Sequence, residues 1–107
     1  KIAEASILPC RERKLIAAGF LEDGHTFFAH ANSNGNFGYQ QSTIADYTCT
    51  VRTEDGRGSG WVGTNVQDVD TFDAGKDVQI AMRKAAASVD AQALEPGKYT
   101  VILEPAA

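Results

Sequence analysis

Residues 44–53 read Ile-Ala-Asp-Tyr-Thr-Cys-Thr-Val-Arg-Thr, and this stretch decides the fold class. Its odd positions from Ala45 to Val51 are apolar or aromatic, whereas its even positions from Asp46 to Arg52 are polar or charged. Successive side chains of a strand point to opposite faces, so the alternation predicts a β-strand with one buried and one solvated face. Strands of that kind are typical of antiparallel sheets.

A hairpin is predicted directly after this strand. The pair Asp55-Gly56 favours a tight turn, because glycine adopts positive φ freely. The chain then returns through a strand at Gly58–Val66, where three glycines flank Trp61. We expect either a β-bulge or a close approach of another backbone or a ligand at these glycines.

A helix is predicted from Ala74 to about Val89, with its N-cap supplied by Asp70, Thr71 or Asp73. Its apolar residues recur at steps of three and four, which places them on one helix face. They are Val78, Ala81, Met82, Ala85 and Val89. Pro96-Gly97 breaks the chain after the helix, and the alternation within Lys98–Glu104 predicts a closing strand.

The segment before residue 44 is interpreted as a series of hairpin strands. Lys14–Leu21 and Thr26–Ala31 are predicted strands joined by a turn at Asp23-Gly24. Asn32–Asn36 is a second turn, because Asn and Gly tolerate left-handed backbone and Asn side chains bond the local backbone. Phe37–Ser42, rich in aromatic residues, is predicted to begin the next strand.

The fold class predicted from these elements is α+β. A mostly antiparallel sheet of four to five strands has one main helix before its last strand. Residues 1–8 favour a short N-terminal helix that stops at Pro9, since proline lacks an N–H donor and disfavours helix in the residue before it. Residues 1–107 form a single domain in this interpretation.

Composition excludes several classes of function. The 107 residues carry a formal net charge of −4, which argues against binding to the phosphate backbone of nucleic acids. The longest apolar run, Leu15–Leu21, is far shorter than the ~20 residues that span a bilayer. Two cysteines make no disulfide framework of a small secreted domain, so we expect a cytoplasmic protein. The start at Lys1 and the only methionine at Met82 indicate a piece of a longer protein.

The residue types that catalyse reactions or bind metals have no suitable spacing. His25 and His30 are five residues apart, which places them on opposite faces of a strand. The acidic segment 68–73 lacks the glycine and the twelfth-position glutamate of a calcium loop. Cys49 lies on the apolar face of its strand, with no base placed beside it. We therefore predict no catalytic and no metal-binding residue in this chain.

Several stretches, in this order, resemble the central part of the TldD/PmbA family of zinc metalloproteases, also described as modulators of DNA gyrase. Ala31–Gly35 is similar to the family's Asn-Ser-x-Gly turn, and Gln41–Val66 is similar to the strands that follow it. Ala74–Ser88 and Leu94–Ala107 resemble its alanine-rich helix and its Pro-Gly, strand and Pro-Ala passage. The resemblance covers about residues 13–107.

The resemblance implies that the family's zinc-binding helix, His-Glu-x-x-x-His, lies after this passage. None of the family's zinc ligands, and not its catalytic glutamate, then falls within this chain. Zinc is expected in the full-length parent, which would hydrolyse peptide bonds in peptides or unfolded proteins. By this resemblance the chain is a non-catalytic scaffold or assembly domain. Its partners would be the rest of the parent chain, a related subunit in a homodimer or heterodimer, and a peptide substrate.

Two other functions remain open. The first is a peptide-binding module that adds an extended ligand to an exposed strand edge, for which Phe37–Ser42 qualifies because it contains neither Pro nor Lys. Polar turns on rigid scaffolds often bind ligands, so the turn after the second strand supplies candidate binding side chains. They are Asn32, Ser33 and Asn34. The second is a small enzyme using His30 or Cys49, which requires a cleft that joins these side chains to a base.

Overall fold

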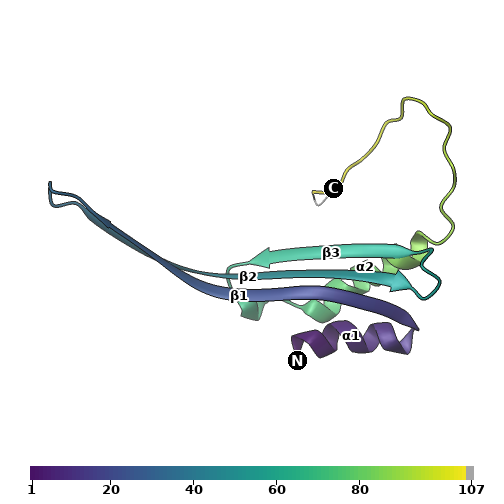
Figure 1. Ribbon diagram of the computed structural model, residues 1–107, viewed down its shortest axis with the longest axis horizontal. Coiled ribbons are helices and arrows are strands. Elements are labelled where there is room, and N and C mark those ends of the chain that lie inside the picture. The colour runs from purple at the N-terminus through teal and green to yellow at the C-terminus, as the bar shows by residue number, and fades with distance from the viewer. Residues whose placement is uncertain (106–107) are drawn as a thin grey trace.

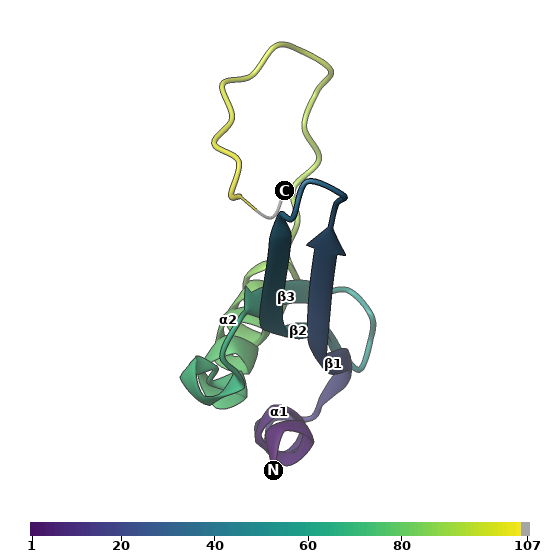
Figure 2. The ribbon, with the colours of Figure 1, turned by 90° about the vertical axis from the view of Figure 1, so that its left-hand side faces the viewer.

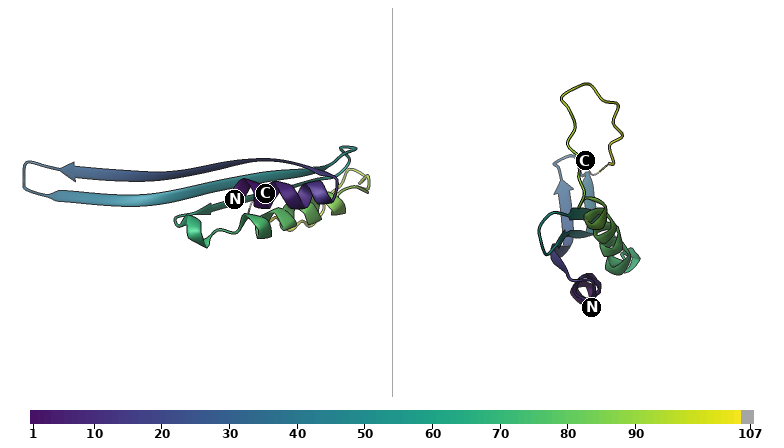
Figure 3. Two further views of the ribbon diagram at one scale, coloured as in Figure 1. Left: turned by 90° about the horizontal axis from the view of Figure 1, so that it is seen from below. Right: turned by 90° about the vertical axis from the view of Figure 1, so that its right-hand side faces the viewer.

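The computed structural model describes residues 1–105. Three strands form one antiparallel sheet in the order β1-β2-β3, and both helices pack on one of its faces (Figures 1 and 3). The elements in chain order are α1 (Ile2–Glu12), β1 (Leu15–Ala31), β2 (Phe37–Thr53), β3 (Ser59–Val66), the 3-10 helix η1 (Val69–Thr71) and α2 (Ala74–Ala87). The predicted α+β class holds, whereas the prediction of four to five strands is wrong.

The core lies between β2 and the helices. The alternation within residues 44–53 is confirmed, because Ala45, Tyr47, Cys49 and Val51 are all less than 5% exposed. They pack on the apolar face of α2, where Val78 and Ala81 are fully buried. Helix α1 closes the same core through Cys10, which is 1% exposed. Area removed from water stabilises this two-layer arrangement at roughly 25 cal/mol per Å².

Helix α2 follows the sequence prediction closely. Of the three candidate N-caps, Asp73 caps it, since its carboxylate accepts the backbone N–H of Lys76 at 3.0 Å. The other predicted apolar positions are buried, but Val89 lies beyond the end of the helix and is half-buried. A cap of this kind stabilises a helix by about 1 kcal/mol.

The predicted turn at Asp55-Gly56 joins β2 to β3, and Gly56 adopts a φ of +72°. The carboxylate of Asp55 accepts hydrogen bonds from the Thr53 hydroxyl and from Arg57, and these hold the pKa of Asp55 well below its usual range. The expected close approach at the following glycines is also found. Gly58 and Gly60 lie against the backbone of α2, so the neighbour is a helix of the same chain.

The predicted turn at Asp23-Gly24 is wrong, because β1 runs through it without interruption. A tight Asp-Gly turn needs positive φ, and Gly24 is not among the residues that adopt it. Every residue from Leu15 to Ala31 instead pairs with β2, whose two predicted parts form one strand. The hairpin turns at Asn32–Asn36, as predicted, with Gly35 at a φ of +82°.

The predicted end of the first helix at Pro9 is also wrong. Helix α1 continues through Pro9 to Glu12, although proline removes the hydrogen bond that residue 9 would donate to Ala5. Burial of Cys10 in the core offsets this loss. Neither helix of the described chain has the length and hydrophobicity that crossing a membrane requires.

The predicted closing strand at Lys98–Glu104 is absent. After α2 the chain runs in an irregular loop away from the sheet, and Ile102 is 98% exposed (Figure 1). An ion pair between Lys84 and Glu104, 2.5 Å from Nζ to Oε2, ties the loop to α2. Alternating apolar residues become a strand only when a neighbouring edge takes their hydrogen bonds, and none does so within residues 1–105.

Candidate functional site

A long two-stranded ribbon extends beyond the core. Strand β3 pairs with residues 45–52 of β2, so the paired segments of Gly24–Ile44 project without a third strand from the part of the chain that the structure describes (Figures 1 and 2). We call Gly24–Ile44 the arm. It gives the molecule its longest dimension of 64 Å. A hydroxyl pair, Thr26 and Ser42 at 2.8 Å, links its two strands near the base.

The arm carries exposed aromatic rings and no charged side chain of Asp, Glu, Lys or Arg. Phe27, Phe37 and Tyr39 are 74%, 73% and 55% exposed. By strand parity they lie on the face that both helices cover further along the sheet, together with Ala29 and Ala31. We call these five residues the arm face. The arm face is the continuation of the core-facing side of the sheet, beyond the part that α1 and α2 cover.

The tip of the arm holds the candidate binding residues. The side chain of Asn32 accepts the backbone N–H groups of Asn34 and Asn36 at 3.0 and 3.2 Å, so it holds the turn together. Ser33 and Asn34 are exposed beside it. The structure thus brings the three residues together at the far end of the arm, where peptide binding by them stays a prediction.

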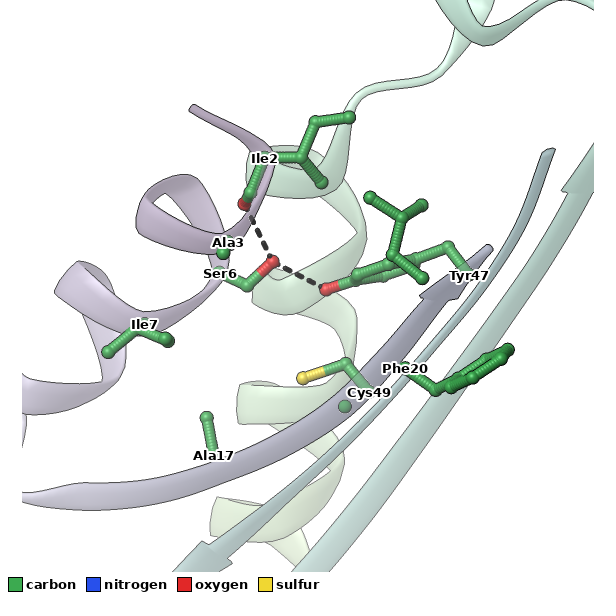
Figure 4. A pocket seen from close by; sticks show the side chains of 10 residues that line it. Ile2, Ala3, Ser6, Ile7, Ala17, Phe20, Tyr47 and Cys49 are labelled. Carbon is green, nitrogen blue, oxygen red and sulfur yellow. Dashed lines mark hydrogen bonds between the residues drawn. The ribbon is translucent and has the colours of Figure 1, made fainter. Parts of the chain in front are cut away.

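An apolar pocket lies between α1 and β1 (Figure 4). We call it the α1 groove; its volume is about 160 Å³. Its walls include Ile2 and Ile7 of α1 and Ala17, Gly19 and Leu21 of β1. Because almost all of these side chains are apolar, the groove suits an apolar side chain or a single aromatic ring.

One polar contact lies at the inner end of the groove. The hydroxyl of Tyr47 lies 2.7 Å from the Ser6 hydroxyl, which itself donates to the carbonyl of Ile2 at 3.1 Å (Figure 4). Burial raises the pKa of Tyr47 to about 12, with the neighbouring Cys49 adding to the rise. Burial also raises the pKa of the Cys10 thiol. These groups are therefore neutral and hold α1 against the sheet.

The Tyr47→Phe variant tests this contact. At pH 7 it is expected to lower the free energy of unfolding by about 1 kcal/mol, the usual net value of one hydrogen bond. Above pH 10 the order of stability of the two proteins is expected to change. Because the folded pKa of Tyr47 is raised, the unmodified chain loses stability between pH 10 and about 12. Urea unfolding across this range should show a smaller loss in the variant, and equal losses in both proteins would contradict the assignment.

The two histidines and Cys49, which the sequence predicts to be unsuited to metal binding, lie apart from one another. His25 and His30 lie on opposite faces of β1, both within the arm. Cys49 is 2% exposed in the core and pairs with Gly19, far along the ribbon from His30. Among residues 1–105, no group of three His, Cys, Asp or Glu side chains is placed to hold a metal ion. The residues described therefore do not fit a zinc site.

Comparison with protein families decides where the chain belongs. Residues 4–92 match the PmbA/TldA metallopeptidase central domain. The chain belongs to this family. Comparisons with curated proteins and with solved structures gave no match. The family match includes most of α1, the whole sheet with the arm, and α2 of this PmbA/TldA central domain, and it ends at residue 92, before the predicted closing strand Lys98–Glu104.

Sequence reasoning missed the two main surfaces of the domain. The signal for the arm was present, since residues 24–44 contain no Asp, Glu, Lys or Arg although they include four aromatic side chains. Such a combination is typical of interface cores. The α1 groove left no comparable signal, because it depends on where α1 packs.

Proposed function

We propose that this chain is the non-catalytic assembly domain of a cytoplasmic TldD/PmbA-like zinc metallopeptidase that acts on peptides or unfolded proteins. The observation that carries the proposal is the uncharged arm with its exposed aromatic face. The zinc ligands and the catalytic glutamate would lie in other parts of a longer polypeptide. The domain's own residues would position subunits around the substrate.

The arm supports this role because a two-stranded ribbon that projects alone into water gains little stability. A two-stranded ribbon is marginally stable in water, and natural proteins usually blunt exposed strands with charges or proline. At roughly 200 Å² per aromatic side chain, the exposed parts of Phe27, Phe37 and Tyr39 come to about 400 Å². A stable interface buries about 800 Å² on each partner. The arm face alone would thus provide half of one subunit's share.

A free strand edge favours a second candidate, the binding of extended peptides. Beyond Ala45 no strand of residues 1–105 pairs with the outer edge of β2, so the backbone of Phe37–Ser42 has no strand partner on that side within the described chain. An extended peptide can add to such an edge through main-chain hydrogen bonds. The segment contains no Pro and no Lys that would prevent this.

Competition with the full-length peptidase tests the assembly role. The 107-residue chain is expected to show no chelator-sensitive hydrolysis of an unfolded protein. Added in excess to dissociated full-length subunits, it should occupy their assembly surface and reduce the chelator-sensitive activity that returns. The matched control is the same chain with the arm shortened to a tight turn at Gly24 and Ile44, which should not compete.

The outcomes separate the candidates. Hydrolysis by the chain itself that a chelator abolishes would contradict a non-catalytic role. Equal competition by the intact and the shortened chains would contradict a role of the arm in assembly. Retention of an extended peptide by the intact chain, with no effect on assembly, would instead support the second candidate.

A further inference from the structure

The outer edge of β1 is long and unprotected. β1 is the first strand of the sheet, and along its 17 residues the edge away from β2 has no hydrogen-bonded neighbour in the described chain. Leu15–Ala31 contains no Pro, Lys or Arg, and its only charges are Glu22 and Asp23. Exposed edges of this length normally carry protection against pairing. Its absence here suggests that the edge is used.

We propose that two copies of this chain pair through their β1 edges, antiparallel, with Gly24 on the two-fold axis. This contact deepens the proposed assembly function and rests on it. The partner is a second copy of this chain, and the surface is the outer edge of β1. Two-fold symmetry makes the contact isologous, so each copy gives and receives the same residues.

The sequence around Gly24 is self-complementary in this register. Side chains directly opposite across antiparallel strands share a face and contact one another. In this register Phe20, Leu21, Asp23 and Ala17 of one copy lie opposite Phe28, Phe27, His25 and Ala31 of the second copy, in that order. In these pairs aromatic and apolar residues meet their like and Asp23 meets a histidine, while Glu22 lies opposite Thr26 and Ala18 opposite His30.

The neighbouring symmetric registers are worse. A two-fold axis perpendicular to the sheet requires one residue to lie opposite itself, so the nearest alternatives centre on Asp23 or His25. The first places two Asp23 carboxylates directly opposite, which is destabilising. The second places Asp23 opposite Phe27. The environment of Asp23, opposite a polar histidine rather than another carboxylate or a phenyl ring, therefore favours Gly24.

This register also fills the α1 groove and covers the arm face. Both copies keep their helices on the same side of the joined sheet, because the two-fold axis is perpendicular to it. Phe27 and Ala29 of the second copy then lie beside Leu21 and Gly19, two residues that line the groove. The groove's volume of about 160 Å³ is comparable to the ~150 Å³ cavity known to hold benzene. One phenyl ring therefore fits.

Helix α1 borders the surface that the second copy would cover. Helix α1 lies on the helix side of the sheet at its β1 end (Figures 1 and 2). Its Ile7 and Leu8 are 45% and 52% exposed, so they offer apolar surface beneath an added strand. The paired stretch and the α1 residues together come to about 20 residues on each copy, which is what a standard interface contains.

A cysteine at the axis tests the register directly. In Gly24→Cys, the new side chain has ordinary space, since its Cβ would lie 3.7 Å from Ile44 Cγ2. Two such cysteines would face each other across the axis, within the Cα separation that a disulfide accepts. Mild oxidation is expected to convert most of the 107-residue chain to a covalent dimer. Cys10 and Cys49 are buried, so the unsubstituted chain should remain uncross-linked.

Two further variants act as register controls. Asp23→Cys and His25→Cys should each fail to cross-link alone, yet form a mixed disulfide when combined, because these residues lie opposite each other. In a separate test without disulfides, Phe27→Glu should weaken dimerisation of the chain by roughly 30-fold in sedimentation equilibrium, as truncation of a central anchor does.

Several results would overturn the proposal. These are a monomeric chain with no Gly24→Cys cross-link, or efficient cross-linking of Asp23→Cys or His25→Cys alone. If the chain were monomeric but still competed with full-length subunits through its arm, the β1 pairing would be wrong and the assembly function would stand. A chain that dimerises in this register without competing would contradict the assembly function and keep the pairing.

Discussion

A full-length parent protein in which Phe27, Phe37 and Tyr39 are all replaced by serine is expected to lose its proposed assembled form. The three rings are exposed in the isolated domain, so serine there removes little from its core. At an interface each ring is expected to contribute about 1–2 kcal/mol. Loss of all three would weaken the dissociation constant of the assembly roughly 10³-fold.

Sedimentation velocity over a range of concentrations would measure this loss, with peptidase activity followed in the same samples. Activity should fall with the assembled fraction, and high protein concentration should restore part of it. The matched control replaces Leu94, Tyr99 and Ile102 by serine. These residues are 75%, 54% and 98% exposed but lie outside the arm. Full assembly of the arm variant at low concentration would show that the arm face is not an assembly surface.

The part of the fold that the sequence predicts well is the part where local pattern and burial agree. Residues 45–52 alternate in polarity, and the structure places that strand between two others with one face on the helices. The cap at Asp73 and the turn at Gly56 are also local features, set by side-chain and backbone chemistry within a few residues. Such features need no knowledge of distant contacts.

The errors arise where distant contacts override local preference. Asp23-Gly24 has the composition of a tight turn, but pairing along the whole of β2 keeps it extended. The turn at Asn32–Asn36 is better supported, since the Asn32 side chain satisfies two backbone donors there. At Lys98–Glu104 the opposite occurs, because a strand-like pattern finds no edge to pair with in residues 1–105.

The candidate site is predictable only in part for the same reason. The charge-free composition of residues 24–44 is visible in the sequence, and it indicates an interface. The segment projects as a ribbon because β3 is shorter than β2. Strand β3 pairs with β2 from Ala45 to Arg52 and does not reach the arm. The α1 groove depends instead on where α1 packs against β1, because its lining residues come from both elements.

Gly60→Ala is expected to lower the free energy of unfolding by about 3 kcal/mol or more, although it adds a single methyl group. A Cβ at Gly60 would lie 2.6 Å from the backbone nitrogen of Ala85 and 2.7 Å from Lys84 Cβ, and closer still to the carbonyl oxygen of Ala81. Overpacking usually costs about 1–3 kcal/mol when side chains can shift. Here the obstacle is helix backbone, so the cost falls at or above the upper end.

Urea unfolding at neutral pH, followed by the circular dichroism of the helices, would measure the change. Gly97→Ala is the matched control, because it lies outside the proposed interface, its Cβ would meet Tyr99 at an ordinary 3.4 Å and its stability should change by less than about 1 kcal/mol. Similar values for both variants would mean that α2 does not pack on β3 as described. Helix α1 packs on the same core as α2, through Cys10. Moving α2 away from β3 would therefore also widen the α1 groove, and Gly60→Ala should weaken dimerisation although it lies outside the proposed interface.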